Sequence, residues 1–236
     1  MKKAEIKKAY DKLHHVNFIN RIKKSKGNEK KVFEYRLTAP WHRIAIEFLN
    51  NLKLKNKKVL EIGCGYGSLS VYMTKKGAKV TGIDLSSEAI QISKRNASLN
   101  NQKIILKQAS GENIPFKDQS FDLVVCCETL EHIPDYKGAI DEILRVTRDS
   151  GNIIITVPNS FNPRGFYLRI KSRQPVENFF SYWTILKELN KRNFKIINQK
   201  SKSFFTDYDN DNLLDEMINK TPLKYLSLRI GLLVKK

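Results

Sequence analysis

A glycine-rich turn between a strand pattern and a helix pattern is the feature that most constrains the fold of this chain. Lys58–Ile62 is a short apolar run typical of a buried strand, and Leu69–Lys76 has the spacing of a helix. Between them, glycine occupies positions 63, 65 and 67. Glycine lets the backbone turn sharply and approach a ligand where a Cβ atom would collide. The turn predicts a nucleotide-binding corner, and the alternative is a tight corner that serves packing alone.

Strand and helix patterns alternate along the chain after this turn. Such alternation predicts a parallel sheet with helices on both faces, because each crossover returns the chain to the same end of the sheet. Further strands are expected at Lys79–Ile83, Lys103–Lys107, Phe121–Cys127, Asn152–Val157, Phe194–Gln199 and Arg229–Val234, and further helices at Ser87–Leu99, Tyr136–Thr147, Tyr182–Arg192 and Asp211–Asn219.

A basic amphipathic segment precedes the alternating region. Residues 1–31 hold ten lysines and one arginine against three acids, and apolar side chains recur at helical spacing over Ile6–Ile19. Gly27-Asn28 would end this helix, and a second helical pattern covers residues 44–52. We expect residues 1–54 to form a helical cover on the core. The alternative is an arm that binds a membrane or RNA.

The chain is strongly basic, with 43 Lys and Arg against 24 Asp and Glu and a net charge of +19. Such an excess attracts nucleic acid, anionic membranes or acidic substrates. Cys64, Cys126 and Cys127 cannot form a disulfide framework, because one thiol is always left over. There is no apolar run of the roughly 18 residues that a membrane span needs, and no secretory signal pattern. We expect a soluble cytoplasmic protein.

An acidic residue at the end of the second strand narrows the ligand class. Asp84 follows Gly63 by 21 residues, where a carboxylate can accept hydrogen bonds from both ribose hydroxyls. Ser68 stands where a dinucleotide-binding turn would have its third glycine, and the lysine of a phosphate-binding loop is absent. The pattern therefore favours a nucleoside without a pyrophosphate.

Ordered sequence blocks resemble those of the class I S-adenosylmethionine-dependent methyltransferases, types 11 and 12, over roughly residues 55–160. The resemblance implies a Rossmann-like, doubly wound α/β fold with a mostly parallel seven-stranded sheet whose last strand is antiparallel. It divides the chain into the cover at 1–54 and a core at 55–236, with a substrate-side insertion at 159–181. The blocks are the glycine turn, Asp84, Ser110–Phe116, Ser120–Asp135 and Gly151–Asn159.

The same resemblance implies S-adenosylmethionine as cofactor and assigns its contacts. The chain departs from the family at Ser110, where an aspartate near the adenine amino group is frequent, and a serine oxygen would accept that hydrogen bond more weakly. The implied cofactor-binding residues are Glu61, Gly63, Cys64, Gly65, Gly67, Asp84, Leu85, Ser110, Gly111, Glu112, Cys127 and Glu128.

Methyl transfer to a hydroxyl needs a base, because the hydroxyl is a poor nucleophile until its proton leaves. His132 is the candidate base and Glu131 its partner, although His132 could instead brace the turn. With Glu128 they form an E-x-x-E-H cluster that resembles the one in ubiquinone-pathway O-methyltransferases, where it is associated with magnesium. We expect an enzyme without a metal, with these three residues as the alternative ligand set.

The sequence lacks the signatures of two methyltransferase subclasses. There is no Asn/Asp-Pro-Pro-aromatic motif for gripping an amino nitrogen, and no Pro-Cys pair for attack on a pyrimidine ring. The resemblance thus favours a small-molecule or lipid-like acceptor, methylated at oxygen. The alternatives are an RNA methyltransferase and a non-catalytic module that binds the cofactor or a membrane.

The segment after the fifth strand interleaves basic and bulky apolar residues. Residues 159–175 carry four cations, no acids and several aromatic side chains. This composition suits a lid over the acceptor, an anionic membrane surface that would hold the protein peripherally, or single-stranded nucleic acid. Nucleic acid is the least favoured of the three.

Overall fold

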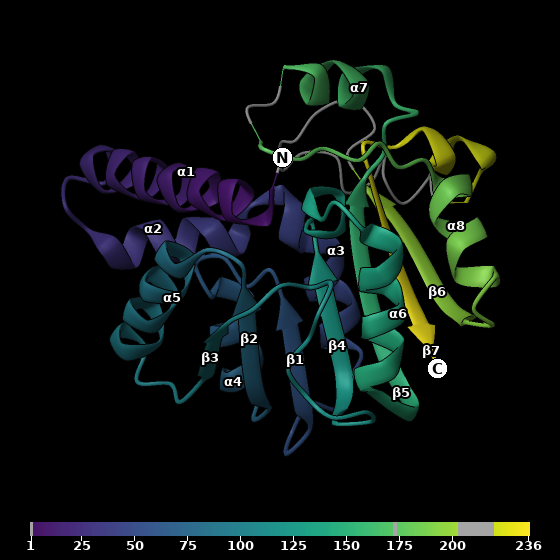
Figure 1. The fold of residues 1–236 in the computed structure, drawn as a ribbon, viewed down its shortest axis with the longest axis horizontal. Coiled ribbons are helices and arrows are strands. Elements are labelled where there is room, and N and C mark those ends of the chain that lie inside the picture. Colours follow the sequence, from purple (N-terminus) through teal and green to yellow (C-terminus); the bar gives the residue numbers. More distant parts are fainter. Residues whose placement is uncertain (1, 172–173, 203–219) are drawn as a thin grey trace.

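A computed structural model describes residues 2–171, 174–202 and 220–236, and its centre is a seven-stranded sheet between layers of helices (Figure 1). The strand order is β3-β2-β1-β4-β5-β7-β6. The strands are β1 (Lys58–Ile62), β2 (Lys79–Asp84), β3 (Ile105–Gln108), β4 (Phe121–Cys127), β5 (Thr147–Pro158), β6 (Lys195–Lys202) and β7 (Arg229–Lys235).

The pairing of the strands confirms the predicted topology. Strands β1 to β5 pair in parallel, whereas β7 runs antiparallel to both of its neighbours. Ile62 at the end of β1 lies opposite Ile83 in β2 and Cys126 in β4. The segments that leave β1, β2 and β4 therefore meet at one edge of the sheet, where ligands bind in open α/β sheets.

The helices are positioned by capping residues as well as by apolar faces. Asn28, Ser86, Asp135 and Ser181 each accept a hydrogen bond from the first turn of the helix that they precede. The helices are α1 (Lys3–Lys24), α2 (Glu29–Thr38), α3 (Pro40–Asn50), α4 (Ser68–Lys75), α5 (Ser87–Leu99), α6 (Tyr136–Val146), α7 (Pro163–Ile170) and α8 (Tyr182–Asn190), with short 3-10 turns η1 (Leu130–His132) and η3 (Pro222–Leu226).

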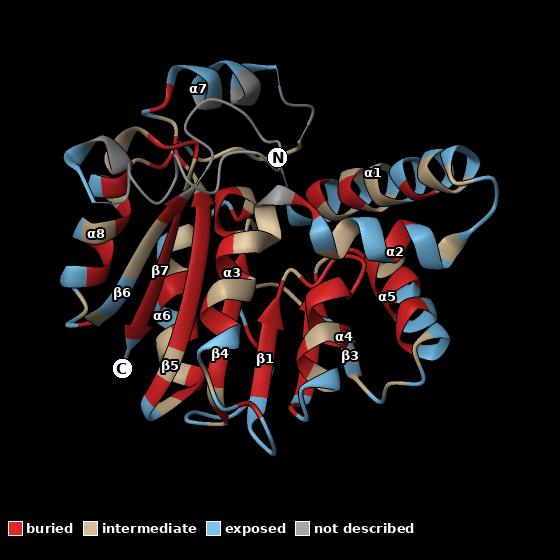
Figure 2. Ribbon diagram, turned by 180° about the vertical axis from the view of Figure 1, so that it is seen from behind, coloured by how far each residue is buried: buried red, intermediate tan, exposed pale blue. Residues whose placement is uncertain are grey.

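The core lies on both faces of the sheet. In β4, Val124 and Cys126 belong to the cluster under α6 and α8, whereas Leu123 and Val125 belong to the cluster under α3 and α4. Figure 2 shows the middle strands buried between these layers. Burial on both faces explains why the strand sequences are continuous apolar runs rather than alternating ones.

The N-terminal cover consists of three helices, of which α2 was not predicted. Ile6, Tyr10 and Phe18 are the buried side chains of α1, whereas Val16 and Ile19 are exposed, contrary to the face expected from spacing. The reason is that α1 packs on α5 and α2 rather than on the sheet. Aromatic contacts with the glycine turn and α2 then decide which side is buried.

The insertion at residues 159–181 also contains a helix, α7, in a stretch for which the sequence pattern predicted no helix. The helix expected at residues 211–219 lies outside the described residues. Among the helices that are described, none has an apolar stretch long enough to cross a bilayer.

Candidate active site

The glycine turn leaves β1 with three left-handed residues. Gly63, Gly65 and Gly67 have φ values of 68°, 51° and 69°. A Cβ atom at Gly63 would collide with the Thr129 side chain, and one at Gly67 with Ser93. At Gly65 the nearest atom to such a Cβ would be 4.0 Å away. Two of the glycines therefore serve packing, and Gly65 opens toward a cavity.

Asp84 is fixed beside this turn at the end of β2. Its Oδ2 accepts a hydrogen bond from the Gly65 backbone N–H, and its Oδ1 accepts one from the Ser86 N–H, both at 2.9 Å. Each carboxylate oxygen keeps a second lone pair for another donor. The side chain lines the cavity and can accept hydrogen bonds from vicinal hydroxyls there.

Glu61 and Glu112 line the same cavity but are held by protein donors. The Glu61 carboxyl is buried and accepts a hydrogen bond from Ser70 in the first turn of α4, and burial raises its pKa to about 8. Glu112 accepts hydrogen bonds from the Asp135 N–H at 3.1 Å and the Ser110 hydroxyl at 3.3 Å, and pairs with Lys3 of α1 at 3.1 Å. Burial opposes ionisation of Glu112, but these contacts lower its pKa.

One cavity of about 560 Å³ joins this region to the turn after β4. Helix α1 contributes Tyr10 and His14 to its wall, and α2 and α3 contribute Arg36 and Trp41. Of the predicted site residues, Gly67 is not in the lining. The predicted residues that the cavity does bring together are Glu61, Gly63, Cys64, Gly65, Asp84, Leu85, Ser110, Gly111, Glu112, Cys127, Glu128, Glu131 and His132.

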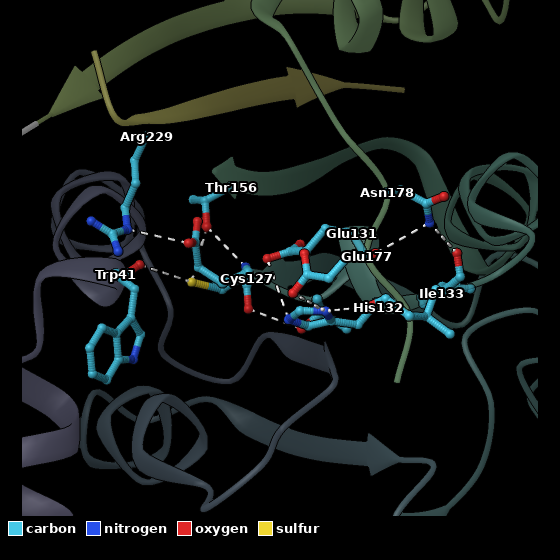
Figure 3. Close-up of polar contacts among 12 residues, drawn as sticks. Trp41, Cys127, Glu131, His132, Ile133, Thr156, Glu177, Asn178 and Arg229 are labelled. Atoms are coloured by element: carbon cyan, nitrogen blue, oxygen red, sulfur yellow. Dashed lines mark hydrogen bonds and ion pairs between the residues drawn. The ribbon is translucent and has the colours of Figure 1, made fainter. Parts of the chain in front are cut away.

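His132 lines the cavity and lies between two carboxylates, those of Glu131 and Glu177 (Figure 3). Its Nδ1 is 3.1 Å from the Val176 carbonyl and 3.6 Å from Glu177, and its Nε2 is 3.8 Å from Glu131. A carbonyl oxygen only accepts, so Nδ1 carries a proton in this contact and Nε2 is the basic nitrogen of the neutral ring.

The segment that holds His132 comes from the insertion. The Asn178 N–H donates to the Glu131 carbonyl at 2.7 Å, and the Asn178 side chain donates to the Ile133 carbonyl at 2.7 Å (Figure 3). These hydrogen bonds place Val176 and Glu177 against the imidazole. The sequence pattern did not identify Glu177, because this residue follows His132 by 45 positions and only the fold brings the two side chains together.

Glu128 does not share a helical face with Glu131 and His132. Its φ of 48° is left-handed, and its carboxylate accepts a hydrogen bond at 3.3 Å from Nε of Arg229, the first residue of β7. Burial raises the pKa of Glu128 to about 7, although Arg229 opposes the shift. In the described ranges no group of three His, Cys, Asp or Glu side chains has the arrangement of a metal site.

Several cavity residues carry no local sequence signal. Tyr10, Arg36, Trp41 and His42 come from the N-terminal helices, and Arg229 begins β7. The basic character of residues 1–31 indicated a cover helix but not which side chains would enter the cavity. The packing of α1 and α2 against the glycine turn determines which of their side chains enter the cavity.

Comparison with known proteins agrees with this arrangement. A family model described as a methyltransferase domain matches residues 60–155. The ubiquinone biosynthesis O-methyltransferase of Alkalilimnicola ehrlichii is 34% identical over 118 residues, covering 50% of this chain and 47% of that protein. The chain thus spans about half the length of this curated relative.

Solved structures share the fold. An S-adenosylmethionine-dependent methyltransferase from Mesorhizobium loti aligns with a TM-score of 0.64 at 15% identity, covering 83% of this chain and 98% of that chain. The cyclase SpnF aligns with a TM-score of 0.62 at 17% identity, covering 80% and 78%. The fold therefore hosts more than one kind of protein, and the residues of the site, not the fold, determine the reaction.

The residues present fit S-adenosylmethionine. Gly65 leaves open the space where a Cβ would stand, and the Asp84 carboxylate beside it has lone pairs directed to the same cavity. The methyltransferase match covers β1, the glycine turn, β2 and β4, which build this part of the cavity. Residues 60–155 thus match a methyltransferase-domain family, and the fold of the chain is the one seen in an S-adenosylmethionine-dependent methyltransferase.

Proposed function

We propose that this protein transfers a methyl group from S-adenosylmethionine to an oxygen atom of a small or lipid-like acceptor. The observation that carries the proposal is the placement of His132. It lies in the same cavity as the glycine turn and Asp84, with a carboxylate near each ring nitrogen. The similarity to the Alkalilimnicola O-methyltransferase supports oxygen as the acceptor atom.

The cofactor-binding half of the site would hold the nucleoside and the amino acid. Asp84 accepts the ribose hydroxyl hydrogens, and the Gly65 backbone lies against the ligand without a side chain between them. The Ser110–Glu112 segment borders the adenine side. When bound, S-adenosylmethionine supplies a methyl group already activated for displacement, so the protein needs no covalent intermediate.

His132 would act as the general base. Nε2 takes the proton of the acceptor hydroxyl, and the Val176 carbonyl keeps the other proton on Nδ1. The imidazolium that forms is stabilised by Glu131, 3.8 Å from Nε2, and by Glu177, 3.6 Å from Nδ1. The proton of the acceptor thus remains on His132 until solvent removes it.

Helix α1 would exclude water from the reacting atoms. Tyr10 is buried over this part of the cavity, and its hydroxyl is 3.5 Å from the His132 carbonyl. The Tyr10 and His132 rings are 6.2 Å apart. Alignment of the acceptor and removal of water are the main contributions a protein makes to such a displacement.

A lipid-like acceptor is supported by the surface of the insertion. Phe161, Phe166, Tyr167 and Ile170 on and before α7 are all about half exposed or more, and Arg164 and Lys171 are exposed beside them. Exposed aromatic and aliphatic side chains interleaved with cations suit an anionic membrane. We therefore include peripheral membrane attachment in the proposal, with vesicle sedimentation as its measurement.

The proposed function is tested by following the methyl group. Purified protein is incubated with methyl-labelled S-adenosylmethionine and a cell extract, and the product is partitioned into lipid, aqueous, protein and RNA fractions. We expect label in the lipid or small-molecule fraction, released as methyl iodide when hydriodic acid cleaves the methyl ether. Label confined to RNA or protein, or no label above the His132→Asn background, contradicts the proposal.

A further inference from the structure

Arg36 is a cation in the cofactor half of the cavity that the chain itself does not neutralise. It lies on α2, and its guanidinium stacks over the Tyr66 ring at 4.6 Å and the Trp41 ring at 5.2 Å. Its Nε is buried without a hydrogen-bond partner. In the ranges that the structure describes, no carboxylate lies within ion-pair distance of this side chain.

Arg36 is half-buried, and such an arrangement is unusual for a guanidinium group that is largely removed from water. Guanidinium groups removed from water are normally paired with carboxylates and donate several hydrogen bonds, because the loss of hydration is otherwise not compensated. Ring stacking attracts the cation but satisfies none of the five N–H donors. Burial lowers the pKa of Arg36 to about 10, which leaves the side chain charged at neutral pH. The site therefore holds a positive charge that can pair with an anionic group of a ligand.

The acids on the same side of the cavity are already engaged. Glu61 accepts a hydrogen bond from Ser70 in α4, and Asp84 accepts hydrogen bonds from the N–H groups of Gly65 and Ser86. The neighbour of Arg36, His42, cannot neutralise it either. Burial, together with the Arg36 charge, lowers the pKa of His42 to about 3, so this ring is neutral and its Nδ1 is a second buried atom without a partner.

The position of Arg36 points to one anion. A guanidinium nitrogen, NH2, is 4.0 Å from the place that a Cβ of Gly65 would occupy. This is the open side of the glycine turn, which the proposed function assigns to the cofactor. S-adenosylmethionine carries a single anionic group, the carboxylate of its methionine part, and a guanidinium can bind a carboxylate through two parallel hydrogen bonds.

We propose that Arg36 binds the methionine carboxylate of the cofactor and that this contact supplies the anion missing from the unliganded site. The inference rests on the proposed cofactor site. Because Arg36 belongs to the N-terminal cover, the bound cofactor would also hold α2, and with it α1, against the core. The inference also predicts that removing the charge does not destabilise the unliganded protein.

Calorimetric titration with two ligands tests the contact. S-adenosylhomocysteine carries the carboxylate, whereas its decarboxylated analogue keeps the nucleoside, the thioether and the amine. We expect Arg36→Met to weaken S-adenosylhomocysteine binding by about 10–100-fold and to change binding of the analogue by less than threefold. Arg36→Lys, which keeps the charge but loses the planar fork, should fall between the wild type and Arg36→Met.

Arg21→Met is the matched control. Arg21 also stacks on a tyrosine ring, Tyr35 at 5.3 Å, but does not line the cavity, so its loss should leave both affinities unchanged. Thermal melts without ligand should give Arg36→Met a melting temperature at or above that of the wild type. Equal weakening of both ligands by Arg36→Met, or no weakening of either, overturns the inference. Failure of the wild type to bind either ligand would overturn the cofactor site itself.

Discussion

The carboxylate of Asp84 accepts a hydrogen bond from the backbone N–H of Gly65 at 2.9 Å, which ties the end of β2 to the glycine turn that follows β1. The contact joins residues from two neighbouring parallel strands and places a charged acceptor beside an open stretch of backbone. It also fixes the side chain before any ligand arrives, so little conformational entropy is lost on binding. The cofactor half of the cavity is therefore largely preorganised.

Gly65→Ala should separate binding from folding. The new methyl group meets no atom closer than 4.0 Å, and the φ of 51° costs about 1–2 kcal/mol, which lowers the melting temperature by roughly 2–8 °C. The methyl group occupies ligand space, so S-adenosylhomocysteine affinity should fall at least tenfold. Gly67→Ala collides with Ser93 and should cost more stability. Equal losses of stability and of affinity in the two variants would contradict this division of roles.

The buried Glu61 carboxyl should make stability fall as pH rises. Its pKa is about 8 in the folded protein against a usual 4.5, so between these values the folded state binds a proton that the unfolded state releases. The stabilising contribution is complete below about pH 4.5 and is lost as pH rises through 8. Urea unfolding should show the wild type losing roughly 2–4 kcal/mol more than Glu61→Gln between pH 5 and 9.

Glu128 contributes a shift of the same sign, since burial raises its pKa to about 7, but it is present in both proteins and cancels in this comparison. Glu34→Gln, on the exposed face of α2, is the control and should leave the pH dependence unchanged. Parallel pH profiles for the wild type and Glu61→Gln would show that Glu61 is ionised in the folded state.

Asp11 should stabilise the contact between α1 and α5. Its Oδ1 accepts hydrogen bonds from the Ser86 hydroxyl at 2.8 Å and the Glu88 N–H at 3.2 Å at the start of α5. Asp11→Ala removes both bonds and a negative charge at a helix N-terminus, so the free energy of unfolding should fall by about 1–2 kcal/mol. Glu34→Ala serves as the control, and an equal effect of the two changes would remove this role from Asp11.

The positions of the strands and the residues that line the cavity from the ends of β1, β2 and β4 could be predicted from sequence. The signal there is local, because the glycine turn, Asp84 and the turn after β4 each follow an apolar run and all leave the same edge of a parallel sheet. The antiparallel last strand was implied by family resemblance and is confirmed by the pairing of β7 with β5 and β6.

The rest of the site could not be predicted, because it comes from packing between distant segments. Arg36 and Tyr10 enter the cavity only when the N-terminal helices settle on α4 and α5, and Glu177 only when the insertion returns to His132. The three-residue ligand set suggested by E-x-x-E-H assumed helical backbone. The left-handed Glu128 breaks that helix and sends its carboxylate toward Arg229 instead.

His132→Asn should remove the general base and leave the affinity for the cofactor nearly unchanged. Loss of a general base typically slows a reaction by about 100–10,000-fold, and kcat should fall in that range while the affinity for S-adenosylhomocysteine changes by less than threefold. Glu131→Gln should give a smaller loss, because the imidazolium keeps Glu177 as a partner. His15→Asn, at an exposed position on α1, is the control. A full rate in His132→Asn would exclude the base assignment.

Calorimetric titration of S-adenosylmethionine into the purified protein tests the central claim most directly. The wild type should bind one equivalent, Asp84→Asn and Asp84→Ala should bind at least tenfold more weakly, and Asp118→Asn, an exposed acid outside the cavity, should match the wild type. Thermal melts establish that the variants are folded. Absence of binding by the wild type at millimolar cofactor, or equal binding by folded Asp84 variants, would contradict the site described for this chain.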